Sequence, residues 1–213
     1  MNYRTTQALR LALWCVVALM SWMFVAFPAQ GQIPPDAGKY KRELVRNARM
    51  VWGLDAPIST FAAQIHQESG WRADATSPVG AAGLAQFMPS TAGWISGTYK
   101  ALQDNQPNNP TWAIRALVEY NKWLYDRVPP SFNHCERMAF VLSSYNGGLG
   151  WLQKDVQLAK VNGADVTRWF DNVERFNSGR SAANFKENRG YPDRILNTLE
   201  YRYRTDGWGI TSC

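Results

Sequence analysis

Residues Gln64 to Ala92 read QIHQESGWRADATSPVGAAGLAQFMPSTA. This segment contains the single carboxylate from which we interpret the fold. We predict a helix over residues 58–69, because apolar residues recur there at the spacing of one buried stripe. The stripe consists of Ile58, Phe61, Ala62 and Ile65. Glu68 lies on the same stripe, so its side chain leaves the helix from the face that points at the core. Gly70 follows as the residue that ends the helix.

The position of Glu68 indicates a chemical role for its carboxyl group. A carboxylate at the inner end of a core-facing stripe is partly desolvated, which disfavours the charged form and raises the pKa from a usual value of ~4.3. A general acid near neutral pH needs such a raised pKa. Periodicity alone leaves a second interpretation open, in which Glu68 is an ordinary helix-end residue whose carboxylate turns out to water.

Three further segments follow Glu68-Ser69-Gly70 along the chain. They read SPVGAAGLAQFMP at 77–89, SYNGG at 144–148 and ENRGY at 187–191. In this order, over roughly the C-terminal three quarters of the chain, the four segments resemble the motifs of the soluble lytic transglycosylase family. Two residues depart from the family pattern, since Ser144 stands where the family usually has Ala and Asn188 where it has Thr. The resemblance implies a mainly α, α+β lysozyme-like domain, in which a small loop or β-hairpin lobe lines a glycan groove.

The resemblance also implies roles for individual residues. Glu68 is expected to be the catalytic acid, which later acts as base. Ser69 is a further candidate for positioning the substrate, and Glu187 is expected to orient Arg189 or Tyr191. The family residues that line the glycan groove correspond to Gln86, Met88, Tyr145, Asn146 and Tyr191.

The residue types agree with these roles. The amide of Gln86 beside the apolar Phe87 and Met88 suits a sugar, because amides bind hydroxyl and acetamido groups while apolar faces cover the ring. Phe87 by itself is better explained as a core residue. Tyr145 lies on the inner face of a predicted helix, where its hydroxyl needs a partner. Asn146 has a structural alternative as a helix C-cap.

The first 31 residues have the pattern of an export segment. Arg4 and Arg10 precede an apolar run at 11–27, and small residues follow at 28–32. The run is long for a signal peptide and near the lower limit for a membrane span, so a cleaved signal peptide and an uncleaved anchor in the inner membrane both remain open. Cys15 is interpreted as part of the apolar run. Residues 32–39 are expected to be a linker and residues 40–213 a single catalytic domain.

Export would leave a basic domain in the periplasm or cell envelope. Loss of Arg4 and Arg10 lowers the net charge from +6 to about +4, since no acidic residue goes with them. An exported basic protein suits an anionic polymer such as peptidoglycan, or a phospholipid surface. We expect a monomer that binds no nucleic acid, because no basic run with interleaved aromatic residues occurs. Cys135 and Cys213 can pair in an oxidising compartment, although two free thiols are the alternative.

The remaining elements are predicted from periodicity and from helix-ending residues. Helices are expected over 40–52 and from Cys135 to about residue 146. A third helix, capped by Thr111 and stopped by Pro129, is assigned to packing alone. Residues 93–109 are expected to be irregular with a short helix near 94–102, and residues 151–176 have no clear period. Pro192 is placed in the first turn of the last helix.

Around Glu68 the sequence offers no second carboxylate with a catalytic position. Asp74 is interpreted as a surface or turn residue, and His66 as a surface histidine. No spacing of Cys and His suits a metal, and no phosphate-binding loop or nucleophile elbow occurs, so no cofactor is expected. We therefore predict a lytic transglycosylase that cleaves the bond between N-acetylmuramic acid and N-acetylglucosamine and leaves a 1,6-anhydromuramic end. A hydrolytic lysozyme or endolysin, and a catalytically silent glycan-binding protein, are the alternatives.

Overall fold

The computed structural model describes residues 32–213, so the predicted export segment, including the apolar run at 11–27, lies outside the described residues. Within residues 32–213 no helix is long and apolar enough to cross a membrane. The α-helices are α2 (Ala37–Trp52), α3 (Ile58–Ser69), α4 (Pro89–Thr98), α5 (Pro110–Tyr125), α6 (His134–Gly147), α7 (Leu149–Val161), α8 (Ala182–Asp193) and α9 (Glu200–Thr205). The other helical elements are the 3-10 helices η1 (Lys100–Leu102) and η2 (Val173–Arg175) and the π-helical η3 (Arg194–Leu199). The predicted mainly helical class is confirmed.

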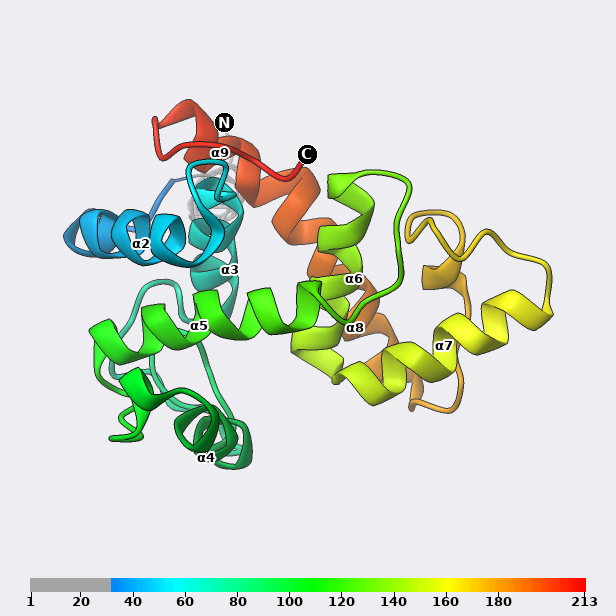
Figure 1. Ribbon diagram of the computed structural model, residues 1–213, viewed down its shortest axis with the longest axis horizontal. Helices are drawn as coiled ribbons and strands as arrows, with labels where there is room; N and C mark the ends of the chain where they lie inside the picture. The colour runs from blue at the N-terminus through cyan, green and yellow to red at the C-terminus, as the bar shows by residue number, and fades with distance from the viewer. Residues whose placement is uncertain (1–31) are drawn as a thin grey trace, which may run out of the picture. The chain divides into compact units, whose positions relative to one another are not determined.

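Helix α3 is the central element of the described region. It packs against α2, η3 and α9 (Figure 1), and all four residues of its predicted stripe are at most 2% exposed. The helix has the predicted bounds, and Gly70 ends it in the left-handed conformation with φ 60°. A buried stripe along three turns fixes the rotation of α3, and this rotation determines where Glu68 points.

The predicted small lobe lies between α3 and α4. Its only regular pairing in the described residues consists of two isolated antiparallel bridges, Thr76 with Ala82 and Ala82 with Phe87. Gly83 has φ 73°, and a Cβ there would lie 1.9 Å from the carbonyl oxygen of Pro107. Only glycine permits this approach, which holds the lobe against the segment before α5.

The starts of three helices differ from the sequence prediction. Helix α2 begins at Ala37 instead of residue 40, and α4 begins at Pro89 instead of near residue 94. The predicted cap Thr111 is wrong, because Asn109 caps α5 by accepting hydrogen bonds from the backbone N–H groups of Thr111 (3.0 Å) and Trp112 (3.5 Å). Pro89 and Pro110 each stand in a first helical turn, where the missing N–H carries no cost.

The position predicted for Pro192 is wrong. Pro192 lies inside α8, and the chain continues through η3 into α9 without a break. Proline lacks an N–H and its ring crowds the preceding turn, so the wider π-helical hydrogen bonding that follows is the local response. The predicted apolar stripe after this proline is nevertheless buried, at Ile195, Leu196, Leu199 and Tyr203.

A disulfide joins Cys135 at the start of α6 to Cys213 at the end of the chain. Figure 1 shows the C-terminus beside the first turn of α6. The tail also contacts the core directly, since the backbone N–H of Ser212 donates to Glu200 (2.6 Å) and to Thr60 (3.1 Å). The covalent bond and these contacts together fasten the tail across the end of α3.

Removing the disulfide should destabilise the domain. We expect the double variant Cys135→Ser, Cys213→Ser to lose about 2–5 kcal/mol of unfolding free energy, because the bond closes a long loop in the unfolded chain. Urea denaturation followed by circular dichroism measures the loss. An unchanged unfolding midpoint would mean that the bond contributes nothing to stability.

Candidate active site

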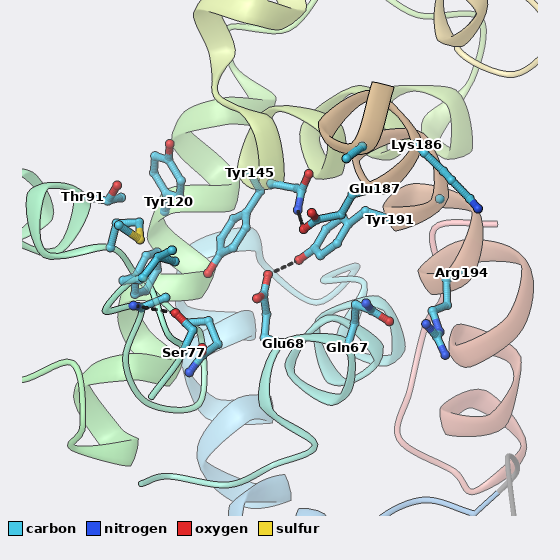
Figure 2. Close-up of a pocket in the computed structure, with 18 residues that line it drawn as sticks. Gln67, Glu68, Ser77, Thr91, Tyr120, Tyr145, Lys186, Glu187, Tyr191 and Arg194 are labelled. Carbon is cyan, nitrogen blue, oxygen red and sulfur yellow. Dashed lines mark hydrogen bonds between the residues drawn. The ribbon is translucent and has the colours of Figure 1, made fainter. Parts of the chain in front are cut away.

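Glu68 lies in the last turn of α3 at the floor of a groove, half-buried between Tyr145 and Tyr191 (Figure 2). Its Oε1 accepts a short hydrogen bond from the hydroxyl of Tyr191. Burial raises the pKa of Glu68 from 4.5 to about 8, although the hydrogen bond from Tyr191 lowers it, and the negative charge of Glu187 raises it further. At neutral pH this carboxyl group is therefore mainly protonated.

The groove has a volume of about 780 Å³ and is lined by residues from the lobe and from α3, α4, α5, α6, α8 and η3. Most of the predicted site residues meet here. Ser69 does not, because its hydroxyl is buried and donates to the carbonyl of Leu84 (2.9 Å), so it holds the lobe against α3 and does not line the groove. The predicted residues that line the groove are Glu68, Gln86, Met88, Tyr145, Asn146, Glu187 and Tyr191.

Gln86 is held in one orientation by the lobe. Its backbone has φ 47°, and its side-chain nitrogen donates to the carbonyls of Gly83 (2.9 Å) and Ala75 (3.1 Å). The side-chain oxygen is thus left as the atom that can accept a hydrogen bond from a ligand. Of the two apolar neighbours, Phe87 is 3% exposed and Met88 is 40% exposed, so Phe87 is a core residue as predicted and Met88 presents an apolar surface to the groove.

Helices α6 and α8 are joined beside the groove by an amide network. The buried Asn188 donates to the carbonyl of Ser143 (2.9 Å) and to Oδ1 of Asn146 (3.0 Å). Asn188 thus connects the two helices at the position where the resemblance led us to expect Thr. Helix α6 ends at Gly147 and its C-cap is Gly148, so Asn146 is not the cap. Tyr145 donates to the carbonyl of Ala85 (2.8 Å), which supplies the partner that its hydroxyl was predicted to need.

Sequence reasoning missed several groove residues. Helix α5 was assigned to packing alone, but its Tyr120 lines the groove together with Thr91 of α4. Lys186 and Arg194 add two cationic side chains. Tyr120 lies next to the buried Asn121, a polar interruption of the α5 stripe whose amide donates to Gln64 of α3 (2.7 Å). That interruption marks a buried hydrogen bond between α5 and α3, so the sequence carries no local signal for the role of Tyr120 in the groove.

Glu187 is a second carboxylate of the same groove, which the sequence interpretation placed only as an orienting residue. It is exposed, and its Oε1 accepts a 3.4 Å hydrogen bond from the amide of Asn146. Asp74 is exposed in the lobe, in agreement with a surface role. Within the described chain no group of three His, Cys, Asp or Glu residues gathers to hold a metal ion.

The assignment of His66 to the surface needs correction. The ring is half-buried, and its Nδ1 lies 3.0 Å from the hydroxyl of Tyr203 in the core. Burial lowers the pKa of His66, and the charges of Arg202 and Arg194 lower it further. His66 is therefore a neutral packing residue of α3 at neutral pH.

The domain is thus mainly helical and carries a groove with a half-buried carboxyl group at its floor. The family model for the transglycosylase SLT domain matches residues 51–167, more than half of the chain. The chain belongs to this family.

Relatives of known name agree with this assignment. The membrane-bound lytic murein transglycosylase F of Pasteurella multocida is 36% identical over 111 residues, covering 52% of this chain and 21% of the relative. Its namesake in Vibrio cholerae is 32% identical over 178 residues, covering 76% of this chain and 31% of the relative. The chain thus spans about a fifth to a third of these relatives.

The fold is similar to that of solved lytic transglycosylases. A 70-kDa soluble lytic transglycosylase in complex with bulgecin A superposes with a TM-score of 0.60 at 24% identity, over 80% of this chain and 25% of that one. The 70-kDa enzyme from Escherichia coli gives a TM-score of 0.55 at 24% identity, over 81% of this chain and 25% of that one. At this identity the likeness concerns the fold.

Proposed function

We propose that this protein is a peptidoglycan lytic transglycosylase that cleaves the β-1,4 bond between N-acetylmuramic acid and N-acetylglucosamine. The observation that carries the proposal is the carboxyl group of Glu68, whose pKa is raised to about 8 by burial at the floor of the groove. A group that is protonated at neutral pH can deliver a proton to a glycosidic oxygen. The names of the relatives and the cationic Lys186 and Arg194 on the groove wall support an anionic murein substrate.

In the proposed mechanism Glu68 acts twice. Its proton goes to the glycosidic oxygen as the bond to the anomeric carbon breaks, which leaves a carboxylate and a positive charge at that carbon. The carboxylate then takes the proton of the muramyl C6 hydroxyl, whose oxygen bonds to the anomeric carbon, and the acid is regenerated. Tyr191 donates to Oε1 and so stabilises the intermediate carboxylate. The product is a 1,6-anhydromuramic end.

Hydrolysis is the second candidate function, and Glu187 is the observation that favours it. Inverting glycosidases use one carboxylic acid and one carboxylate, with a water molecule between the latter and the sugar. Glu187 is an exposed second carboxylate on the groove wall, where it would serve as such a base. A catalytically silent glycan-binding protein would use the same groove without turnover.

Analysis of the products separates the three functions. Purified protein is incubated with peptidoglycan, and the soluble fragments are examined by mass spectrometry before and after borohydride reduction. We expect fragments that are lighter by one water molecule and resist reduction, and Glu187→Gln should still produce them. Reducible ends that are present in the products of the unmodified protein and absent from those of Glu187→Gln would establish hydrolysis. The absence of soluble fragments would mean that the protein binds glycan without cleaving it.

The pH dependence of the reaction should follow the titration of Glu68. Because the acid must be protonated, we expect kcat/KM to fall as pH rises through about 8, the pKa of the folded protein. Tyr191→Phe removes a hydrogen bond that favours the charged form, so the fall should move to higher pH. Tyr120→Phe, a groove tyrosine without this bond, is the control for the shift. A fall near pH 4.5 in the unmodified protein would contradict the assignment of Glu68.

We also propose that the protein acts in the cell envelope after export. The basic composition, the export pattern in the first 31 residues and the membrane-bound relatives support this location. N-terminal sequencing of the protein from separated soluble and membrane fractions decides whether residues 11–27 are cleaved or retained as an inner-membrane anchor. Recovery of Met1 in the membrane fraction would establish the anchor.

A further inference from the structure

A second cavity opens beside the groove and shares a wall with it. Its volume is about 430 Å³, and it lies between the start of α7, the segment before α8 and the first turns of α8. Asn146 and Glu187 line both this side cavity and the main groove. A branch of a ligand bound in the groove can therefore extend into the side cavity.

Arg180 is a buried cation on the wall of the side cavity. Its side chain is 4% exposed, and its Nη1 makes a short contact with the carboxylate of Asp155. The other terminal nitrogen, Nη2, has no hydrogen-bond partner among the residues that the structure describes. A Cβ on Gly147, which also lines the cavity, would lie 3.4 Å from this Nη2. The same Cβ would lie 2.6 Å from Nδ2 of Asn188, so glycine permits Asn188 and Arg180 to pack closely at this wall.

The buried cluster around Arg180 holds two guanidinium groups against one carboxylate. Asp155 is shared between two guanidinium groups, since Nη2 of Arg189 also donates to it (2.8 Å). The carboxylate of Glu187, on the shared wall, accepts a hydrogen bond from the amide of Asn146. The backbone N–H groups at the start of α8, after its cap Ser181, add partial positive charge at the cavity mouth. These features together favour an anionic ligand.

We infer that the side cavity binds a carboxylate of the peptide that branches from the muramyl residues of the glycan, with Arg180 as its charged partner. The inference rests on the proposed function, which places a peptidoglycan strand in the groove. The peptide leaves the sugar next to the bond that is cleaved, and it carries free carboxylates. Trp151, which is 38% exposed and lies over Arg180, provides an apolar surface for the peptide chain at the same cavity.

The test adds a negative charge at the cavity mouth without disturbing the helix. Asn184 lines the side cavity three residues after the cap Ser181, whose Oγ accepts from the Asn184 N–H. Glutamate at this third position favours helix formation, so Asn184→Glu should fold even if variants of the buried Arg180 do not. Ala182→Glu is the matched control, because it adds the same charge to the same exposed helix turn away from the cavity.

The readout is binding, which does not depend on cleavage. Full-length Glu68→Gln protein is titrated at 0.15 M salt with soluble glycan strands whose peptides carry either free carboxylates or the corresponding primary amides. We expect about tenfold tighter binding of the carboxylate form, the size of one charge-assisted hydrogen bond. Adding Asn184→Glu should remove most of this preference, and adding Ala182→Glu should retain it.

Two results would overturn the inference. One is equal affinity of the Glu68→Gln protein for the carboxylate and amide forms. The other is a loss of preference in Ala182→Glu as large as that in Asn184→Glu, which would indicate general repulsion in place of a site. A failure of the proposed function would appear separately, as an absence of cleavage by the unmodified protein. The binding measurement could still be interpreted in that case.

Discussion

Replacing Glu68 with glutamine is expected to lower kcat on peptidoglycan by at least about 1,000-fold, because the variant loses the group that both donates and accepts the proton. Glutamine has nearly the same shape and keeps an oxygen that can accept from Tyr191. The groove should therefore retain its form and its affinity for glycan strands. Release of soluble fragments measures turnover, and co-sedimentation with insoluble peptidoglycan measures binding.

The matched control for this variant is Gln67→Glu, which adds a carboxylate to the same groove one residue earlier on α3. Combined with Glu68→Gln it should not restore turnover, because a side chain one position away points about a quarter-turn from the Glu68 direction. Residual activity of Glu68→Gln near that of the unmodified protein would disprove the catalytic role of Glu68.

Replacing Asp155 with asparagine should cause the largest loss of stability, about 3–5 kcal/mol of unfolding free energy. Asp155 is fully buried and accepts from Arg180, Arg189 and Ser178. The variant would leave two buried guanidinium groups without their carboxylate. The loss should extend to the groove, because Arg189 belongs to α8, which carries Glu187 and Tyr191.

Chemical denaturation measures the effect of Asp155→Asn, and Asp165→Asn provides the comparison. Asp165 forms an exposed pair with Arg168 at 3.5 Å, and exposed ion pairs contribute little to stability. Equal losses in the two variants would contradict the structural importance of the buried cluster.

Stability should also depend on the charge of Asp155. Burial opposes this charge, but hydrogen bonds from Arg189, Ser178 and Arg180 outweigh it and hold the pKa of Asp155 below 3.8. A group whose pKa is lowered in the folded state makes its full contribution to stability above the pKa that it has in the unfolded state. The contribution is therefore present above pH 3.8 and is lost as pH falls below it.

The elements that could be predicted are those determined by local sequence. The stripe of α3, the glycine at its end and the position of Glu68 all depend on residues within three helical turns. The order of the four motifs then indicated which side chains meet in the groove. Gln86, Met88, Tyr145, Asn146 and Tyr191 do line it with Glu68.

The features that were missed depend on contacts between distant segments. Helix α7 was not predicted because Asp155 interrupts its apolar face, and this interruption is stabilised by Arg180 and Arg189, 25 and 34 residues later. The burial of Ser69 depends on the carbonyl of Leu84, and the role of Tyr120 in the groove depends on how α5 crosses the domain. Local periodicity carries no information about such partners.

Direct titration of Glu68 is the measurement that tests the account most sharply. The side-chain carboxyl carbons of ¹³C-labelled glutamate are followed by NMR between pH 3 and pH 10, and the Glu68 signal is assigned by its absence in Glu68→Gln. The structure predicts a midpoint at about pH 8 for this residue. A midpoint near the ordinary value of 4.5 would contradict a protonated acid at neutral pH, and with it the proposed chemistry.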